Sequence, residues 1–144
     1  MDKPSNWSRI NKRDNGRGNG WSDDETTRLV KLYLHMLDLQ KANKLGRTTN
    51  ANPDHVSKAT LVKAFMGDNE ARADLRSKGI SLEFPEQAGR TKGSVETKLM
   101  NISASMVALG LPTVTGYKAL SNRSKGLDDV VRATIQGLNQ TLGA

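Results

Sequence analysis

Short hydrogen-bonding side chains and cations recur between residues 89 and 118, in the run GRTKGSVETKLMNISASMVALGLPTVTGYK. If this run is helical, one flank carries Ser94, Thr97, Lys98, Asn101 and Ser105. Side chains of these types hydrogen-bond to base edges when a helix lies in the DNA major groove, and asparagine is suited to adenine. We therefore predict a recognition helix over about 91–109, with Thr97, Asn101 and Ser94 facing the bases.

The cations around this stretch are suited to binding DNA phosphates. Residues 90–125 carry six basic side chains against one acidic side chain, Glu96. We predict phosphate contacts from five of the six basic residues, namely Arg90, Lys92, Lys98, Lys118 and Arg123. Thr91, which can also cap the helix, belongs to the same predicted surface. Tyr117 is expected to pack the following turn or to stack on the DNA backbone.

The net charge of +7 is unevenly distributed along the 144 residues. Residues 1–20 carry +3 and residues 90–125 carry +5, whereas residues 21–89 are neutral and residues 126–144 carry −1. A basic excess attracts polyanions because binding releases their counterions, and nucleic acid is the commonest such partner. Residues 1–20 are rich in Gly and Asn and lack periodicity, which predicts a flexible basic arm whose Arg13 and Arg17 extend the DNA footprint.

The remaining residues, 21–144, are expected to form one all-α domain, a helix-turn-helix-like bundle of four to five helices. Ser22 and Glu25 form a capping-box pattern that opens a helix reaching about residue 41. Further helices are predicted over about 53–66, 70–77, 91–109 and 124–140. The helix over 91–109 has an apolar stripe for packing: Val95, Leu99, Ile102, Met106 and Leu109. Such a stripe is equally typical of an ordinary surface helix, so the charge distribution carries the functional interpretation.

Catalysis, metal binding and cofactor binding are not expected. The chain has no cysteine, and its two histidines, His35 and His55, lack the short spacing of a zinc site. Nucleophile-elbow, P-loop and dinucleotide motifs are absent from the sequence. No apolar run approaches the ~20 residues of a membrane helix. We therefore expect a cytoplasmic, nucleoid-associated protein with no enzymatic activity.

Two segments resemble a known class of DNA-binding module. Trp21-Ser-Asp-Asp-Glu with Leu29 and Tyr33, and Arg90-Thr-x-x-Ser-Val-x-x-Lys-Leu-x-x-Ile, resemble the first and third helices of a Myb/SANT-like helix-turn-helix. The run over 89–118 also resembles the non-catalytic segment of bacterial HNH-endonuclease and modification-dependent restriction proteins. The His-Asn-His nuclease constellation is missing from this chain. The resemblance thus implies a module that senses modified or foreign DNA, either as a stand-alone binder or as a fragment of a longer nuclease.

Other partners remain open from the sequence alone. SANT-like folds also bind protein tails, so the alternative function is an adaptor that contacts a nuclease or another protein without reading DNA. Single-stranded or structured RNA is a third possibility. With an aromatic content of 4%, however, the chain has few side chains on which bases could stack. The oligomeric state does not follow from the sequence, since the last helix could either close the core or dimerise.

Overall fold

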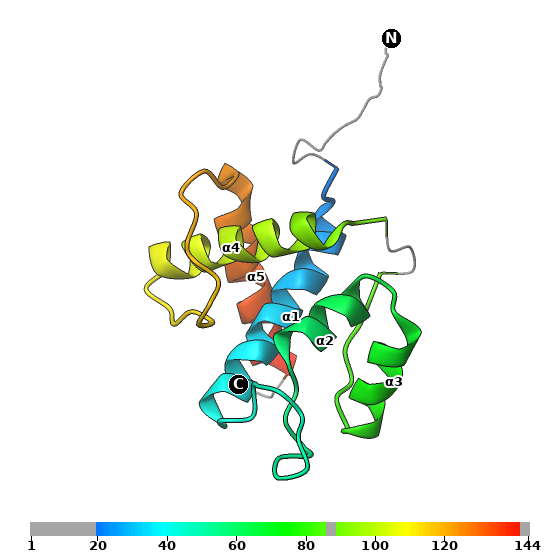
Figure 1. The fold of residues 1–144 in the computed structure, drawn as a ribbon. Coiled ribbons are helices and arrows are strands. Elements are labelled where there is room, and N and C mark those ends of the chain that lie inside the picture. Colours follow the sequence, from blue (N-terminus) through cyan, green and yellow to red (C-terminus); the bar gives the residue numbers. More distant parts are fainter. Residues whose placement is uncertain (1–19, 86–88, 142–144) are drawn as a thin grey trace.

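The computed structural model describes residues 20–85 and 89–141. In these residues the chain forms five helices and no strand (Figure 1). They are α1 (Asp23–Lys41), α2 (Lys58–Phe65), α3 (Asn69–Ser77), α4 (Lys92–Ala108) and α5 (Lys125–Thr141). The predicted all-α bundle of four to five helices is therefore confirmed. The predicted arm, including Arg13 and Arg17, lies outside the described residues except for Gly20.

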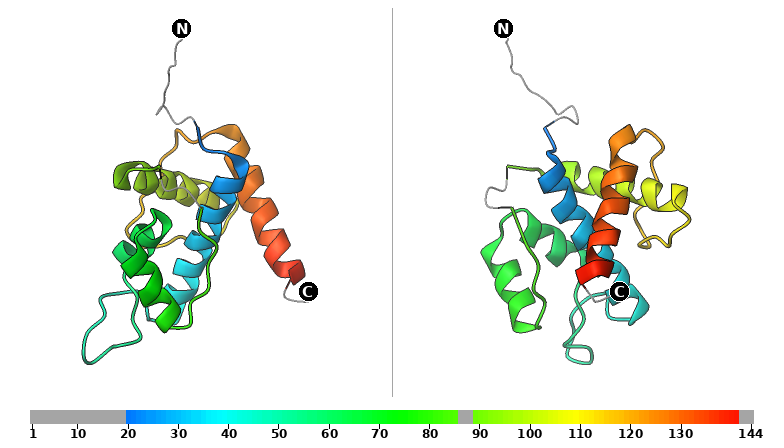
Figure 2. Two further views of the ribbon diagram at one scale, coloured as in Figure 1. Left: turned by 90° about the vertical axis from the view of Figure 1, so that its right-hand side faces the viewer. Right: turned by 180° about the vertical axis from the view of Figure 1, so that it is seen from behind.

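Helix α1 is the element around which the others pack. Its N-cap is Ser22, whose hydroxyl accepts a hydrogen bond from the Glu25 amide at 3.0 Å. Buried side chains extend around much of this helix, since Val30 and Leu32 are buried as well as Leu29, Tyr33, Met36 and Leu37. This wide buried surface follows from the three helices that contact α1, namely α2, α4 and α5. Figure 2 shows α1 running between α2 on one side and α5 on the other.

The start of α2 differs from the prediction. A helix was expected from about residue 53, but α2 begins at Lys58, where the Ser57 hydroxyl accepts a hydrogen bond from the Thr60 amide. The preceding residues are held in a loop by an isolated parallel bridge between Leu45 and Val56. Burial of Val56 in this bridge prevents the helix from starting earlier. Asn52-Pro53 therefore lies in the loop, although this pair is typical of a helix start.

Helix α4 is surrounded in its second half. Thr91 caps it as expected, and it ends at Ala108, followed by the C-cap Leu109 and by Gly110 with φ 73°. All five residues over 102–106 are buried, so this part of the helix has no solvent-facing flank. The prediction that Ser105 lies on the polar flank of this helix is wrong, because Ser105 is fully buried. Burial on all sides is typical of a core helix rather than of an amphipathic surface helix.

The segment between α4 and α5 crosses back over α4 (Figure 1). The backbone N–H of Leu120 donates to the carbonyl oxygen of Met100 in the middle of α4, at 3.3 Å. Earlier in the same segment, Val114 is buried, and its backbone N–H donates to the hydroxyl of Tyr33 at 2.9 Å. The same hydroxyl lies 2.7 Å from the Ser103 hydroxyl, and burial raises the pKa of Tyr33. Tyr33 thus joins α1, α4 and the crossing segment inside the core.

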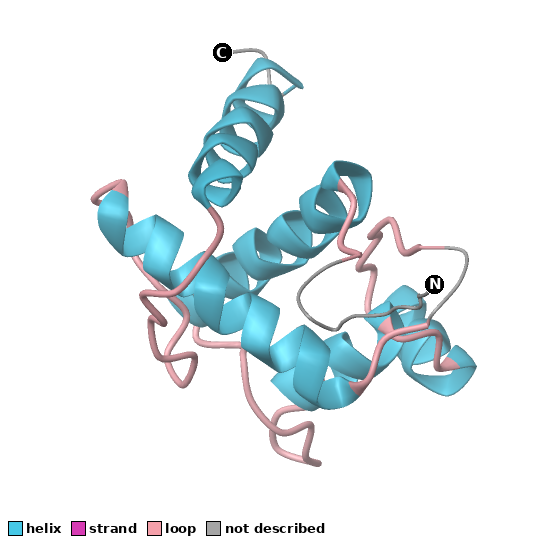
Figure 3. Ribbon diagram, turned by 90° about the horizontal axis from the view of Figure 1, so that it is seen from above, coloured by secondary structure: helices cyan, strands magenta, loops and turns pink. Residues whose placement is uncertain are grey.

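Helix α5 closes one side of the core with its first half. Leu127 and Val131 are buried there, and α5 contacts both α1 and α4. Ile135 and Leu138, the next residues of the predicted stripe, are only half-buried. Figure 3 shows the carboxyl end of α5 extending away from the other helices. Of the two roles that the sequence leaves open for this helix, its first half closes the core.

Candidate nucleic-acid interface

Arg90 connects the end of the amino-terminal arm to the start of α4. Its guanidinium donates to the Gly20 carbonyl oxygen at 2.6 Å and to both carboxylate oxygens of Glu25 at 2.7 and 2.8 Å. It also stacks on the Trp21 ring, 4.3 Å from the ring centroid. Two of the three guanidinium nitrogens of Arg90 and its contact with the Trp21 ring are therefore engaged inside the protein. This arrangement makes Arg90 a positioning residue, whereas the sequence predicted a phosphate contact.

Lys98 lies beside the same cluster. Its ammonium is 5.7 Å from the centroid of the Trp21 ring, which also stacks on the Phe65 ring. Burial lowers the pKa of Lys98, and the neighbouring charge of Arg90 lowers it further. The two predicted phosphate-binding cations Arg90 and Lys98 are thus brought together on one tryptophan. A half-buried lysine next to an arginine gains from an approaching phosphate, because the phosphate offsets the like-charge repulsion.

Arg123 is also paired within the protein. It donates to the two carboxylate oxygens of Asp128 at 2.8 and 3.0 Å, and the Ser105 hydroxyl donates to the same carboxylate at 2.5 Å. These hydrogen bonds, led by those from Arg123, lower the pKa of Asp128 from its usual 3.8 to about 2. Because of this network, the buried Ser105 hydroxyl has a hydrogen-bond partner. It joins α4 to the start of α5.

We expect this network to make stability depend on pH in the acid range. The folded pKa of Asp128 lies below its unfolded value, so its stabilisation is complete above about pH 4 and is lost as the pH falls towards about 2. Asp128→Asn should lower the free energy of unfolding by about 1–2 kcal/mol at pH 6. Urea unfolding of both proteins at several pH values measures this difference, which should shrink on acidification. A difference that stays constant down to pH 2 would contradict the assignment.

Two predicted phosphate-binding lysines have no partner in the described part of the chain. Lys92 is exposed in the first turn of α4, and Lys118 is exposed on the segment that crosses α4. Thr91 and Thr97 are exposed as well, and Ser94 is half-buried. The first turn of α4 contains no acidic residue, so nothing offsets the positive end of its helix dipole. The amino-terminal half of α4 therefore presents a cationic, hydrogen-bonding surface.

Asn101 is less available than the sequence predicts. Its Oδ1 atom is buried and has no hydrogen-bond partner. Asn101 lies one residue beyond Met100, where the crossing segment is hydrogen-bonded to α4. A bidentate contact with adenine requires both the amide oxygen and the amide nitrogen, so the side chain would have to turn outward first.

Tyr117 packs the turn, one of the two roles expected for it. The Lys58 ammonium lies 4.9 Å from the centroid of its ring. Burial, with the negative charge of Glu96 second, raises the pKa of Tyr117 to about 12. Tyr117 is therefore neutral at physiological pH and half-covered. Lys58, Glu25 and Asp128 were not predicted as members of the site. Lys58 and Glu25 act through partners that are distant in the sequence, and Asp128 acts through Arg123, which precedes α5.

Comparisons with known proteins do not extend this description. No family model, curated protein or solved structure matches the chain. Among the described residues, no group of histidine, cysteine and carboxylate side chains has the arrangement of a metal site. Over the same ranges, every helix is too short or too polar to cross a bilayer.

Proposed function

We propose that the chain binds double-stranded DNA through the amino-terminal half of α4 and the adjoining basic arm. The supporting observation is the hydrogen bond between Arg90 and the carbonyl oxygen of Gly20. It holds Gly20, the last residue of the first basic segment, beside Arg90, the first basic residue of the second. A cationic site formed from two segments suits the regularly charged DNA backbone.

Within this proposal, the amino-terminal half of α4 is the part that enters the major groove. Recognition helices contact base edges chiefly through their amino-terminal residues. In α4 this is the part that exposes Thr91, Lys92 and Thr97, whereas residues 102–106 are buried. We propose that Lys92 and Lys118 bind phosphates while Thr97 and Ser94 contact bases. Arg13 and Arg17, which lie outside the described residues, extend the footprint from the arm.

Fluorescence anisotropy with a labelled duplex at several salt concentrations tests this proposal. Phosphate contacts from Lys92, Lys98, Lys118, Arg13 and Arg17 predict that the logarithm of the affinity falls with the logarithm of salt at a slope of about −4 to −5. The double variant Lys92→Ala/Lys118→Ala should make this slope shallower by about 2, since each lysine loses one phosphate.

The matched control is Arg76→Ala on α3. Arg76 is exposed and has no side-chain partner in the described residues, so its removal lowers the charge without altering the surface around α4. Its slope should match that of the unaltered protein. A wild-type slope near zero, or equal effects of the control and the double variant, would overturn the proposal.

A restriction-associated role rests on the resemblance of residues 89–118 to modification-dependent restriction proteins. We propose that the module senses modified or foreign DNA without cutting it, alongside a separate nuclease and in association with the nucleoid. Anisotropy titrations with modified and plain duplexes of one sequence test this part. Equal affinity for the two duplexes would contradict it while leaving DNA binding itself intact.

A protein adaptor is the second candidate function, and one observation favours it. Val107, at the carboxyl end of α4, is 59% exposed, and Leu111, just beyond it, is 36% exposed. Apolar side chains in such positions are typical of protein contacts rather than of DNA contacts. Val107→Asp should impair an adaptor and leave DNA affinity unchanged, whereas Thr97→Ala should have the opposite effect.

A further inference from the structure

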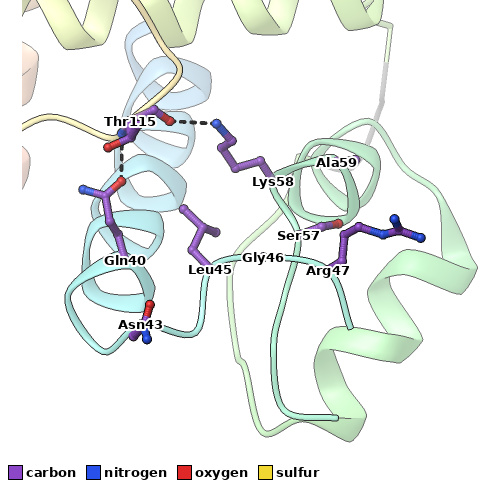
Figure 4. A pocket seen from close by; sticks show the side chains of 9 residues that line it. All are labelled: Gln40, Asn43, Leu45, Gly46, Arg47, Ser57, Lys58, Ala59 and Thr115. Carbon is purple, nitrogen blue, oxygen red and sulfur yellow. Dashed lines mark hydrogen bonds between the residues drawn. The ribbon is translucent and has the colours of Figure 1, made fainter. Parts of the chain in front are cut away.

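A cavity of about 460 Å³ lies beside the carboxyl end of α1, whereas the Arg90 cluster lies beside its amino end. It is formed between the carboxyl end of α1, residues 45–47 and the start of α2 (Figure 4). Gln40, which lines it, is fifteen residues beyond Glu25 on α1, so about 22 Å of helix separates the cavity from the Arg90 cluster. The volume lies within the range of small-molecule sites in proteins.

The walls of this cavity are held in place by hydrogen bonds. The Gly46 amide donates to the Val56 carbonyl oxygen at 2.8 Å, which fixes residues 45–47 against the approach to α2. Gln40 accepts a hydrogen bond from the Thr115 amide at 2.8 Å, and Lys58 donates to the Thr115 carbonyl oxygen at 2.7 Å. The cavity is thus part of the fold, and binding there requires little reorganisation of the backbone.

The cavity lining contains two cations and no carboxylate. Lys58 donates one of its three ammonium protons to Thr115 and also lies 4.9 Å from the centroid of the Tyr117 ring. Arg47 is exposed and has no partner in the described part of the chain. Its guanidinium points away from Lys58 in Figure 4, and no contact prevents it from turning towards a ligand. Leu45 and Ala59 supply an apolar wall.

We propose that this cavity binds a small phosphate-bearing molecule of about mononucleotide size. Arg47 and Lys58 would bind the phosphate, since a guanidinium offers paired donors and an ammonium a concentrated charge. Leu45 and Ala59 would contact the uncharged part of the molecule. The side-chain amide of Asn43, which also lines the cavity and has no partner within the described ranges, supplies a donor and an acceptor for a polar edge.

Isothermal titration of the full chain with AMP, inorganic phosphate and adenosine tests this assignment. AMP should bind more tightly than either fragment, because only AMP engages both the cations and the apolar wall. Arg47→Ala should weaken AMP binding about tenfold, a loss typical of one charge-assisted contact. Arg76→Ala, which removes an equally exposed arginine from α3, should leave AMP binding unchanged. Circular dichroism of the two variants checks that both remain folded.

Three outcomes would overturn the assignment. They are an absence of AMP binding at millimolar concentration, equal binding of adenosine and AMP, and no effect of Arg47→Ala on AMP. The duplex DNA titration separates the two sources of phosphate. Arg47→Ala should leave DNA affinity unchanged, and an equal loss for DNA and AMP would mean that the cavity takes a DNA phosphate instead of a small molecule. Because DNA binding is measured separately, either proposal can fail alone.

Discussion

Replacing Arg90 with alanine should lower the free energy of unfolding by about 3 kcal/mol. The change leaves the Glu25 carboxylate, whose side chain is only 17% exposed, without its hydrogen-bonded cation, and it removes the guanidinium that lies on the Trp21 ring. Losing one member of a largely buried ion pair is far more damaging than losing an exposed one, because the remaining charge stays desolvated. Urea unfolding followed by circular dichroism measures the loss.

A matched exposed pair provides the control for Arg90. Arg132 lies 3.1 Å from Asp129, and the two side chains are 53% and 80% exposed. Arg132→Ala should change the free energy of unfolding by less than about 0.5 kcal/mol, since solvent screens such pairs. A double-mutant cycle with Glu25→Gln should reveal a coupling of about 1–2 kcal/mol between Arg90 and Glu25. Equal losses for Arg90→Ala and Arg132→Ala would rule out the structural role assigned to Arg90.

The second large effect is expected at Tyr33. Tyr33→Phe should lower the free energy of unfolding by about 2 kcal/mol although it removes a single oxygen atom. That oxygen is the partner of the Val114 amide and the Ser103 hydroxyl, and all three residues are buried. Without it, two polar groups in the core lose a hydrogen bond and cannot reach water instead. Thermal unfolding should show a correspondingly lower midpoint.

Tyr117→Phe is the matched control for Tyr33→Phe. The Tyr117 ring contacts Lys58, but its hydroxyl has no hydrogen-bond partner in the described residues. The same loss of one oxygen should therefore change stability by less than about 0.5 kcal/mol. Similar losses at the two tyrosines would show that the effect belongs to tyrosine in general and not to the hydrogen bonds within the core.

The helices were predictable where local signals define both of their ends. Ser22 and Thr91 act as caps through hydrogen bonds to amides three residues ahead, so sequence spacing alone predicts them. Helices α3 and α4 both end just before a glycine, Gly79 and Gly110, because glycine tolerates the positive φ value at these positions. The start of α2 was missed because the bridge at Val56, a contact eleven residues apart along the chain, prevails over the local Asn52-Pro53 signal.

The candidate site was less predictable, because its charges have partners in other helices. Glu25 was expected to reach back to its own helix start, but it binds Arg90, 65 residues away. Arg123 binds Asp128, which lies five residues farther along the chain in the first turns of α5. The acidic members of both pairs lie outside residues 90–125, so the local charge of +5 overstates the field that a ligand meets. Lys92 and Lys118 keep their predicted availability because no carboxylate lies within ion-pair distance of either residue in the described ranges.

The burial of residues 102–106 has a consequence for motion within the native protein. Amide hydrogens that lie in a helix with no exposed flank exchange with solvent only when the whole fold opens. Helix α3 differs, because α2 is its only partner among the described helices. It can separate from the rest while α1, α4 and α5 stay packed. The fold should therefore contain two regions of unequal protection: a slowly exchanging centre in α4, and α3 as a unit that opens on its own under native conditions.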